Sequence, residues 1–398
     1  MRNGWVETTL GEISEVIGGG TPSTAIAEYW DGNIVWLTPT EITSQDGKVI
    51  SDSIRKITDL GFRNSGAQML PKDSVILTSR ASVGYVALSG IDLCTNQGFQ
   101  SLVPKESVLA KFLMFWIQQN RPEFESRSAG STFKEISKSN VKSIKLSIPA
   151  LPEQKRIVDL ISSVDSYIEA LQQQLESAKR SRNAVLHELL TAGRDDWEYK
   201  TLSDICEVRD GTHDSPKPSH EGFALVTSKN IKDGKLDLQS AYLISPQDYI
   251  EVNKRSKVEQ FNLLISMIGT IGEVIVVEVE PNFAIKNVGL LKSTEPILSR
   301  YLCHYLGSQL GKNSISLSVS GSTQKFISLG KLRVLPILYP PRQNQKAIVD
   351  TMSFFDQQIS KNLEVATRIK NLRSSLLSDL LSGEHEIPAS YDKVMGAA

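Results

Sequence analysis

The chain has 398 residues, of which 40% are hydrophobic and 22% charged, which is typical of globular domains and excludes collagen-like or wholly disordered chains. Its 44 basic and 45 acidic residues give a net charge of −1, so nucleic-acid binding would need local basic faces. Three widely separated cysteines indicate neither a disulfide framework nor a zinc cluster. The longest uncharged apolar stretch, Gln260 to Gly272, is too short for a bilayer, and no signal-peptide pattern is present. We expect a soluble, cytoplasmic protein.

The sequence contains an internal tandem repeat. One motif, Trp5-(x3)-Thr9-Leu10-(x2)-Ile13, recurs as Trp197-(x3)-Thr201-Leu202-(x2)-Ile205, an offset of 192 residues. Another, Gly130-Ser131-Thr132-(x)-Lys134, returns as Gly321-Ser322-Thr323-(x)-Lys325 at an offset of 191. Because the motif order is kept, the period is that of two whole domains and not of a solenoid of small units.

Each copy has two parts of different character. Residues 1–152 and 194–343 are rich in short β-branched runs and Asp-Gly turns, which predicts mixed, mainly β domains. Within them, Lys111 to Gln119 and Ser299 to Leu310 are predicted to be short helices. Residues 153–193 and 344–383 are predicted to form long helices, which leaves 384–398 as a tail. The expected fold class is therefore α+β, with a pseudo-twofold internal repeat.

Both long helices carry a heptad pattern. Apolar residues alternate at spacings of four and three, at Ile157, Ile161, Val164, Ile168, Leu171 and Leu175 in the first helix and at Ile348, Met352, Phe355, Ile359, Ile369 and Leu376 in the second. This pattern predicts an antiparallel coiled coil that would hold the two β-rich domains apart. The alternative is an amphipathic helix packed on its own domain. Arg182, Asn362 and Arg373 interrupt the seam and either fix its register or lie in its wetter parts.

No catalytic motif stands out. The chain lacks a phosphate-binding P-loop sequence and has no His or Cys pair with metal-ligand spacing. Asn120-Arg121-Pro122-Glu123 lacks the aromatic residue that an amino-methyltransferase loop needs. The nuclease-like Glu153-Gln154-Lys155 becomes Asn344-Gln345-Lys346 in the second copy, which removes the carboxylate. We therefore expect a non-catalytic chain with no metal and no cofactor of its own.

Several polar residues are candidates for contacts with DNA. Lys134 and Lys325 follow matched Gly-Ser-Thr turns and can supply charge to a phosphate, although a solvated turn is the alternative. Arg80 can reach a guanine edge, and its counterpart region Met267-Ile268-Gly269 has no arginine.

Further candidates lie in matched loops and in one basic run. The matched pairs are Thr40 and Glu41 with Lys229 and Asn230, and Asn96 and Gln97 with Lys286 and Asn287. Asn230 can pair with adenine and Glu41 with cytosine, and plain hairpin connections are the alternative. The basic run contains Lys254, Arg255 and Lys257, and is interpreted either as a phosphate patch or as a solvated face.

The motifs in combination resemble one known family. Ala150-Leu-Pro-Glu-Gln-Lys-Arg-Ile-Val158, before a heptad helix that ends Glu188-Leu-Leu-Thr-Ala-Gly193, resembles the specificity subunit of Type I restriction-modification systems. The Trp-x4-Leu-x2-Ile start of each copy does so too, and the resemblance covers about residues 4–383. The second copy departs from the family pattern at Asn344, where the family has an acidic residue. We expect little effect, because the helix start survives.

The resemblance implies a function. Each β-rich domain would be a target-recognition domain that reads one half of a bipartite, asymmetric site in double-stranded DNA. The helices would set the spacer and dock two modification subunits, which bind S-adenosylmethionine and methylate adenine. Restriction subunits, which use ATP and magnesium, would join them. No membrane association is expected.

Two other functions remain open on sequence grounds. A coiled-coil adaptor that binds only protein is favoured by the near-neutral β-rich domains, which hold 15 basic and 15 acidic residues in 1–152 and 17 and 16 in 196–343. A stand-alone DNA methyltransferase or nuclease is disfavoured by the missing aromatic loop and the unrepeated carboxylate.

Overall fold

The computed structural model describes residues 4–395 except 131–133, 193–196, 233 and 322–324. The chain divides into two compact units. Unit 1 comprises Met1–Ala170 with Ala366–Ala398, and unit 2 comprises Leu171–Val365. Each unit therefore contains one β-rich region together with a part of each long helix. Among the described residues, no helix is long and apolar enough to cross a membrane.

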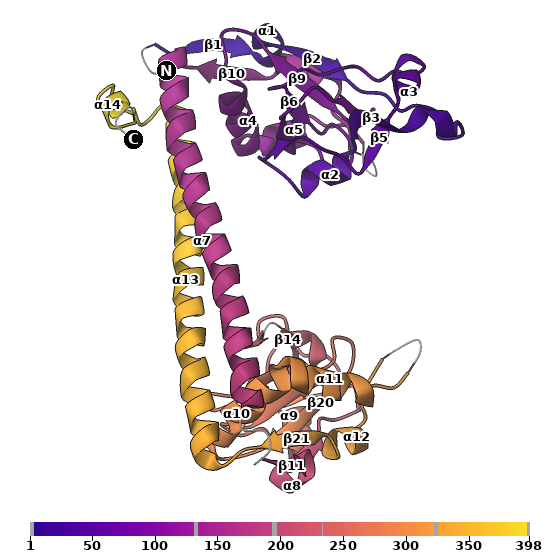
Figure 1. The fold of residues 1–398 in the computed structure, drawn as a ribbon, viewed down its shortest axis with the longest axis vertical. Coiled ribbons are helices and arrows are strands. Elements are labelled where there is room, and N and C mark those ends of the chain that lie inside the picture. Colours follow the sequence, from indigo (N-terminus) through magenta and orange to yellow (C-terminus); the bar gives the residue numbers. More distant parts are fainter. Residues whose placement is uncertain (1–3, 131–133, 193–196, 233, 322–324, 396–398) are drawn as a thin grey trace. The chain divides into compact units, whose positions relative to one another are not determined.

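Unit 1 contains three sheets. Its strands are β1 (Val6–Thr9), β2 (Ser14–Gly18), β3 (Trp30–Leu37), β4 (Val49–Ile50), β5 (Arg55–Ile57), β6 (Val75–Leu77), β7 (Val86–Ser89), β8 (Cys94–Thr95), β9 (Gln100–Pro104) and β10 (Lys145–Ile148). They form a five-stranded sheet in the order β2-β9-β6-β7-β4, a three-stranded sheet β5-β3-β8 and the antiparallel pair β1-β10. Figure 1 labels most of these strands, namely β1, β2, β3, β5, β6, β9 and β10.

Short helices complete unit 1. They are η1 (Ala27–Tyr29), α1 (Leu10–Ile13), α2 (Pro39–Thr43), α3 (Asp59–Arg63), α4 (Ala110–Gln119), α5 (Arg121–Ser126), α6 (Lys138–Ser143) and α14 (Tyr391–Met395). Helix α4 lies where the sequence predicts one, because an unbroken apolar run from Phe112 to Ile117 is fully or almost fully buried in the main core. The same core includes Ile157 and Ile161 from the first long helix and Leu377 and Leu380 from the second.

Unit 2 repeats this plan. Its strands are β11 (Glu198–Thr201), β12 (Glu207–Asp210), β13 (Phe223–Val226), β14 (Ile231–Lys232), β15 (Lys235–Leu236), β16 (Tyr242–Ile244), β17 (Leu263–Ser266), β18 (Val274–Val276), β19 (Phe283–Ile285), β20 (Val288–Lys292) and β21 (Pro336–Tyr339). The sheets are β12-β20-β17-β18, β16-β13-β19, β14-β15 and β11-β21. The β1-β10 and β11-β21 pairs correspond, as do the parallel pairs β3-β8 and β13-β19. The sequence duplication is therefore also a duplication of fold.

The helices of unit 2 correct one prediction. They are η3 (Ser228–Asn230), α8 (Leu202–Ile205), α9 (Pro246–Ser256), α10 (Pro296–Gly307), α11 (Gln309–Ser318) and α12 (Leu329–Arg333). A single helix was expected over Ser299 to Leu310, but α10 ends at Gly307 and α11 begins at Gln309. Ser308 is extended (φ −73°, ψ 166°), and its side chain accepts a hydrogen bond from Gly311 N, so it caps a new helix.

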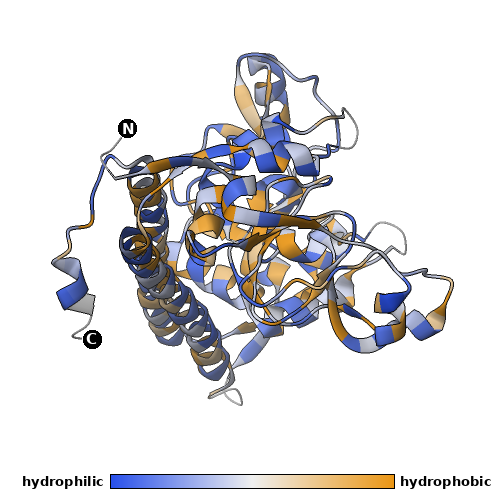
Figure 2. Cartoon of the chain, turned by 90° about the horizontal axis from the view of Figure 1, so that it is seen from above, coloured by the Kyte–Doolittle hydropathy of each residue, from blue (hydrophilic) through white to orange (hydrophobic). Residues whose placement is uncertain are grey.

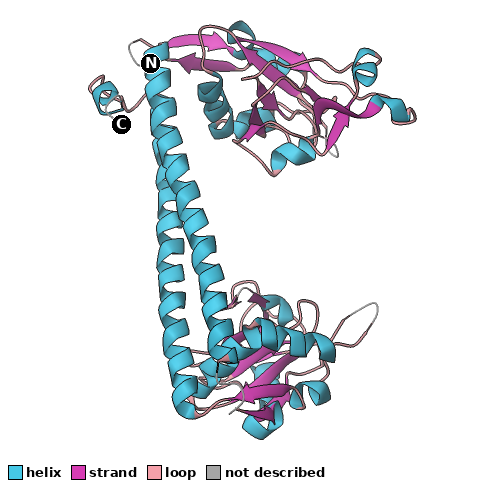
Figure 3. Ribbon diagram, viewed as in Figure 1, coloured by secondary structure: helices cyan, strands magenta, loops and turns pink. Residues whose placement is uncertain are grey.

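The two long helices are α7 (Leu151–Thr191) and α13 (Arg342–Ser382), each continuous over 41 residues (Figure 3). They begin two residues before the expected starts at 153 and 344. One buried side chain ties the start of each helix to the segment before it. The buried Gln154 amide donates to Pro149 O at 2.9 Å, and the equivalent Gln345 donates to Pro340 O at 2.9 Å. Figure 2 shows both helices as mainly hydrophilic, with hydrophobic residues interspersed.

The predicted seam is the covered face of both helices. Every one of its positions is buried or half-buried, whereas apolar residues off the seam, such as Phe354 and Leu372, are 60% exposed. The buried positions are Ile157, Ile161, Ile168, Leu175, Ile348 and Met352, and the half-buried ones are Val164, Leu171, Phe355, Ile359, Ile369 and Leu376.

Matched ion pairs join the helices within each unit. In unit 1, Arg373 Nε and Nη2 donate to the two carboxylate oxygens of Asp165 at 2.7 and 2.9 Å. In unit 2, Arg182 makes the same bidentate contact with Asp356 at 2.5 and 3.1 Å. Asp165 and Asp356 differ by 191 residues, as do Arg182 and Arg373, so each repeat supplies the acid of one pair and the base of the other. Because the partner position on α13 falls from 373 to 356 as the position on α7 rises from 165 to 182, the two helices run antiparallel.

Candidate nucleic-acid interface

In unit 1, several of the predicted contact residues lie at the carboxyl end of the parallel strand pair β3-β8. Strands β3 and β8 pair in parallel through Leu37 and Thr95, so the residues that follow both strands meet at the same sheet edge. Thr40 lies after β3, and Asn96 and Gln97 follow β8. Thr40 and Gln97 are exposed, and Gln97 Oε1 accepts a hydrogen bond from Thr21 Oγ1 at 2.5 Å.

Unit 2 places the matched residues at the same edge. Strands β13 and β19 pair in parallel through Val226 and Ile285. Lys229 follows β13 and is exposed, while Lys286 and Asn287 follow β19 and are half-buried. Ser228 Oγ donates to Asn287 O at 3.2 Å, which ties the two segments together. The structure thus brings together residues that lie more than fifty positions apart in each copy.

Glu41 and Asn230 point inward at these edges. Glu41 is 7% exposed, and its carboxylate accepts from Thr38 N at 2.8 Å, from Thr38 Oγ1 at 2.7 Å and from Ile54 N at 2.8 Å. Asn230, 5% exposed, accepts from Thr227 N and Oγ1, both at 2.9 Å. Both are third residues of capping boxes. Their oxygens are therefore used to hold the loops that carry Thr40 and Lys229.

A second pair of matched loops follows β6 and β17. In residues 78–85, Gly84 N donates to Thr78 O at 3.0 Å, and in residues 266–273, Gly272 N donates to Ser266 O at 3.0 Å. Left-handed backbone occurs at the same places, with φ of 87° at Gly84 and 89° at Gly272. The two loops thus share one backbone design on which different side chains are displayed.

The residues that follow the Gly-Ser-Thr turns, Lys134 and Glu135 in unit 1 and Phe326 and Ile327 in unit 2, pack beside these loops. Arg80 Nε lies 2.9 Å from Glu135 Oε1, with both side chains 46% exposed, and Ala81 N donates to Lys134 O at 3.0 Å. The corresponding positions of unit 2 are apolar, because Ile268 pairs with Phe326.

Lys134 and Lys325 are both exposed. Ser131-Thr132 and Ser322-Thr323, which the turn prediction also involves, lie outside the described residues.

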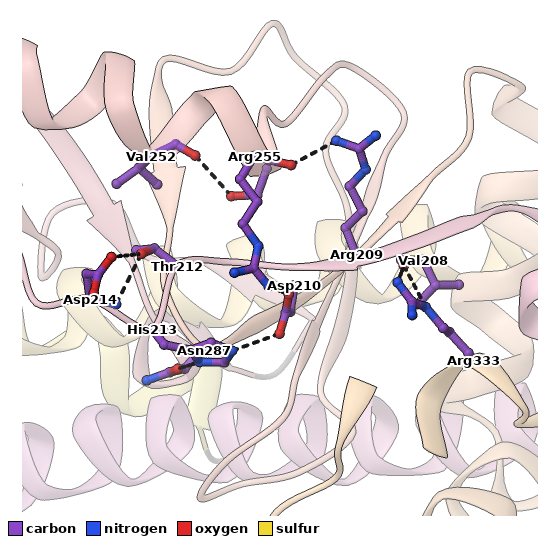
Figure 4. A network of polar contacts seen from close by, with 11 residues as sticks. Val208, Arg209, Asp210, Thr212, His213, Asp214, Val252, Arg255, Asn287 and Arg333 are labelled. Atoms are coloured by element: carbon purple, nitrogen blue, oxygen red, sulfur yellow. Dashed lines mark hydrogen bonds and ion pairs between the residues drawn. The ribbon is translucent and has the colours of Figure 1, made fainter. Parts of the chain in front are cut away.

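One residue of the basic run, Arg255 on α9, belongs to a wider polar network (Figure 4). Arg255 donates to Asp210 Oδ1 at 2.6 Å, and His213 Nε2 lies 3.0 Å from Asp210 Oδ2. His213 Nδ1 lies 2.8 Å from Asn287 Oδ1, so the network joins two of the predicted contact residues. Lys254 pairs with Glu251 at 2.5 Å.

The remaining basic residue of this run, Lys257, is exposed. Sequence reasoning missed Asp210 and His213, because Asp210-Gly211 was interpreted only as a turn. The side chain of Asp210 is 6% exposed in this network.

The described residues offer little for catalysis. Burial raises the pKa of all three thiols, Cys94, Cys206 and Cys303, to about 12, so they stay protonated at neutral pH. Asp379, Glu384 and His385 place ligand atoms within 4.8 Å of one another, but Glu384 and His385 are exposed, and such exposed groups are common without an ion.

Comparison with known proteins identifies the family. The model of the Type I restriction modification DNA specificity domain matches residues 2–180 and again residues 194–369. The chain belongs to this family. Its two specificity domains correspond to the two copies of the repeat. Members of this family are the DNA-recognising, non-catalytic subunits of Type I restriction enzymes.

Two relatives match this chain over nearly their whole lengths. The MjaIX specificity subunit of Methanocaldococcus jannaschii is 28% identical, over 96% of this chain and 93% of the relative. The EcoKI specificity subunit of Escherichia coli K12 is 24% identical, over 99% of this chain and 95% of the relative.

Two solved structures share the fold. The S subunit of the Type I restriction-modification system from M. genitalium has a TM-score of 0.55 at 16% identity, covering 96% of this chain and 97% of that chain. A chain from a structure on complex assembly and conformational transition of the type I R-M system has a TM-score of 0.63 at 18% identity, covering 96% and 98%.

Proposed function

We propose that this chain reads a bipartite, asymmetric DNA site, with one half-site for each β-rich region. The observation that carries the proposal is a duplicated backbone with unlike side chains at matched loop positions. Arg80 and Glu135 in the first copy correspond to Ile268 and Phe326 in the second. An arginine recognises guanine through two hydrogen bonds, whereas an apolar side chain favours contact with a thymine methyl. Two different half-sites follow from this difference.

The residues proposed to contact DNA fall into two groups. Those near base edges in our proposal are Thr40, Arg80, Asn96, Gln97, Lys229, Lys286 and Asn287. Those proposed for phosphates are Lys134, Lys254, Arg255, Lys257 and Lys325. In this proposal Glu41 and Asn230 position the loops, since their side-chain oxygens accept backbone hydrogen bonds within the fold.

The long helices are proposed to set the spacer between the half-sites. From Ile157 to Leu189 a continuous helix is about 48 Å long at ~1.5 Å per residue, which corresponds to roughly fourteen base pairs of duplex. Inserting seven residues into each of α7 and α13 keeps the heptad pattern and should lengthen the preferred spacer or abolish binding. An unchanged spacer would contradict this part of the proposal.

We propose further that the chain acts inside a larger cytoplasmic complex. Two modification subunits would bind S-adenosylmethionine and methylate adenine at the site that this chain selects. Restriction subunits would supply the steps that need ATP and magnesium. In this arrangement the chain itself holds no cofactor, and its helices provide docking surface for the modification subunits.

Sequencing of adenine methylation tests the proposal. DNA is compared from cells that carry the chain with its modification subunits and from cells that lack the chain. A bipartite methylated motif should appear, and exchanging residues 1–152 or 196–343 for those of a relative should change one half of it only. A soluble, assembled complex that methylates no motif would refute the reader function and favour the protein-binding adaptor.

A further inference from the structure

The second specificity domain has a basic stretch that contains no acidic residue. Between Glu295 and Asp350 the chain contains no Asp or Glu but seven Lys or Arg. The equivalent stretch of the first copy, residues 105–158, contains five glutamates. The near-neutral total of the second domain therefore conceals a separation of charge along its sequence.

Most of the seven cations already have partners. Arg300 pairs with Glu278 at 2.8 Å, Lys346 with Asp350 at 2.5 Å, and Arg342 with Glu295, while Arg333 donates to Val208 O at 3.1 Å. Lys331 Nζ donates to Ser320 Oγ at 2.7 Å. Two cations remain, both exposed and with no ion pair to any described residue.

These two are Lys312 on α11 and Lys325, and they line one pocket. The pocket has a volume of about 450 Å³ and lies between α11 and the loop 266–273. Its apolar lining includes Ile271, Ile315 and Val319, and its acidic lining is limited to Glu273. Among the described residues, no aromatic side chain lines it.

In unit 1, an arginine occupies the position that corresponds to Lys312. Arg121, the counterpart of Lys312, has its guanidinium carbon 4.0 Å from the ring centroid of Tyr85, the counterpart of Glu273. Its Nε donates to Gly84 O at 3.2 Å, and its Nη2 forms an ion pair with Asp46. A Cβ added at Gly84 would meet Arg121 Cγ at 2.8 Å, whereas one added at the equivalent Gly272 meets only side-chain carbons of Ile315. The first domain thus uses its cation internally, and the second leaves it at the surface.

The chemistry of the pocket fits a segment of DNA backbone. Two flexible ammonium groups above apolar side chains match the charged oxygens of a phosphodiester and the apolar face of its deoxyribose. The absence of aromatic lining disfavours a stacked base. We propose that Lys312 and Lys325 bind backbone phosphates of duplex DNA at this pocket, so that the second domain contributes more sequence-independent affinity here than the first. This inference rests on the proposed function.

Salt-dependent binding of the full chain to a fluorescent duplex of about 40 base pairs tests the inference, because phosphate contacts need no particular sequence. Each phosphate contact contributes about 0.9 to the slope of log affinity against log salt. The variant Lys312→Gln with Lys325→Gln should lower that slope by about 1.8. Between about 50 and 200 mM salt, the parent should then lose roughly tenfold more affinity than the variant does.

A matched control carries Lys361→Gln and Lys370→Gln, which remove the same charge from exposed positions of α13. It should keep the parental slope. Phe326→Glu, which restores the acidic residue found at Glu135 in the first copy, should weaken binding, and Phe326 is 41% exposed, so the fold should tolerate it.

A failure of the proposed function and a failure of the pocket proposal would give different results. A parent chain that binds no duplex would refute the proposed function. A parent that binds with a steep salt dependence, while the pocket variant and the control have equal slopes, would refute the pocket alone. Melting temperatures of all variants confirm that each is folded.

Discussion

Exchanging the charges of one helix–helix ion pair tests whether these pairs fix the register of the coiled coil. In unit 1, the Asp165 and Arg373 side chains are 35% and 20% exposed and are joined by two hydrogen bonds. The Arg373 guanidinium carbon also lies 5.4 Å from the ring centroid of Phe115. We expect Asp165→Arg to destabilise the helix pair and the double exchange, with Arg373→Asp added, to restore much of the loss.

The partial burial of the Asp165–Arg373 pair determines how large a coupling energy we expect. Exposed ion pairs contribute about 0.2–1 kcal/mol, whereas removing one partner of a buried pair costs about 3–5 kcal/mol. A pair that is only partly exposed falls between these limits, so we expect a coupling energy of about 1–2 kcal/mol. The single variant should lose about 2–3 kcal/mol, because it also places two arginines together.

Native-state hydrogen exchange of the amides between Ile161 and Ala170 measures the local free energy of opening. A local measurement is needed because the chain has two compact units and need not unfold in one step. As a control, Lys179→Ala removes an ion pair with Glu176 whose side chains are 49% and 64% exposed, and should cost under about 0.5 kcal/mol. A coupling energy below about 0.3 kcal/mol in the double-mutant cycle would refute a register role.

Three further outcomes are expected. Burial, followed by the Arg182 cation, lowers the pKa of His304 to about 4. The unfolded chain therefore binds a proton that the folded chain does not between about pH 6.5 and 4, and the free energy of unfolding should fall by up to about 3 kcal/mol as pH decreases through that window. In urea titrations at each pH, His304→Gln should remove the histidine's share of this dependence and leave the share of the carboxyl groups. Met352→Ala removes a fully buried side chain and should cost about 2–5 kcal/mol in chemical denaturation; a loss under about 1 kcal/mol would contradict its core position. Glu41→Ala should lower the stability of unit 1 by about 2–3 kcal/mol and leave the methylated motif unchanged, whereas an altered motif would reveal a base contact.

The sequence predicted the fold well where periodicity carried the information. The spacing of apolar residues located the seam of α7 and α13, because a helix that packs along its whole length must repeat its buried face. The matched motifs predicted two similar domains, and both copies contain the same parallel strand pair. The failure at α10 has a local cause. The apolar pattern continues through Ser308, but the backbone is extended there, and the Ser308 side chain accepts from Gly311 N and donates to Tyr305 O.

The candidate site was harder to predict, because residue type does not reveal whether a side chain points to solvent or into the fold. Thr40 and Glu41 are neighbours, but one is exposed and the other fills a capping box. Lys312 escaped notice for a related reason. In the first copy its counterpart Arg121 lies over the ring of Tyr85, whereas the second copy has Glu273 at the position of that ring. Such pairings between distant segments are determined by tertiary contacts, which a single sequence does not display.

The reciprocal pairing of Asp165 with Arg373 and of Arg182 with Asp356 has an evolutionary consequence. Because each repeat supplies one acid and one base at equivalent positions, a single repeat is complementary to an identical copy of itself. Gene duplication of a half-length ancestor would thus have supplied both helix–helix ion pairs without new charged residues. From that point the loops of each domain were free to diverge toward different half-sites, because none of these four residues belongs to a loop.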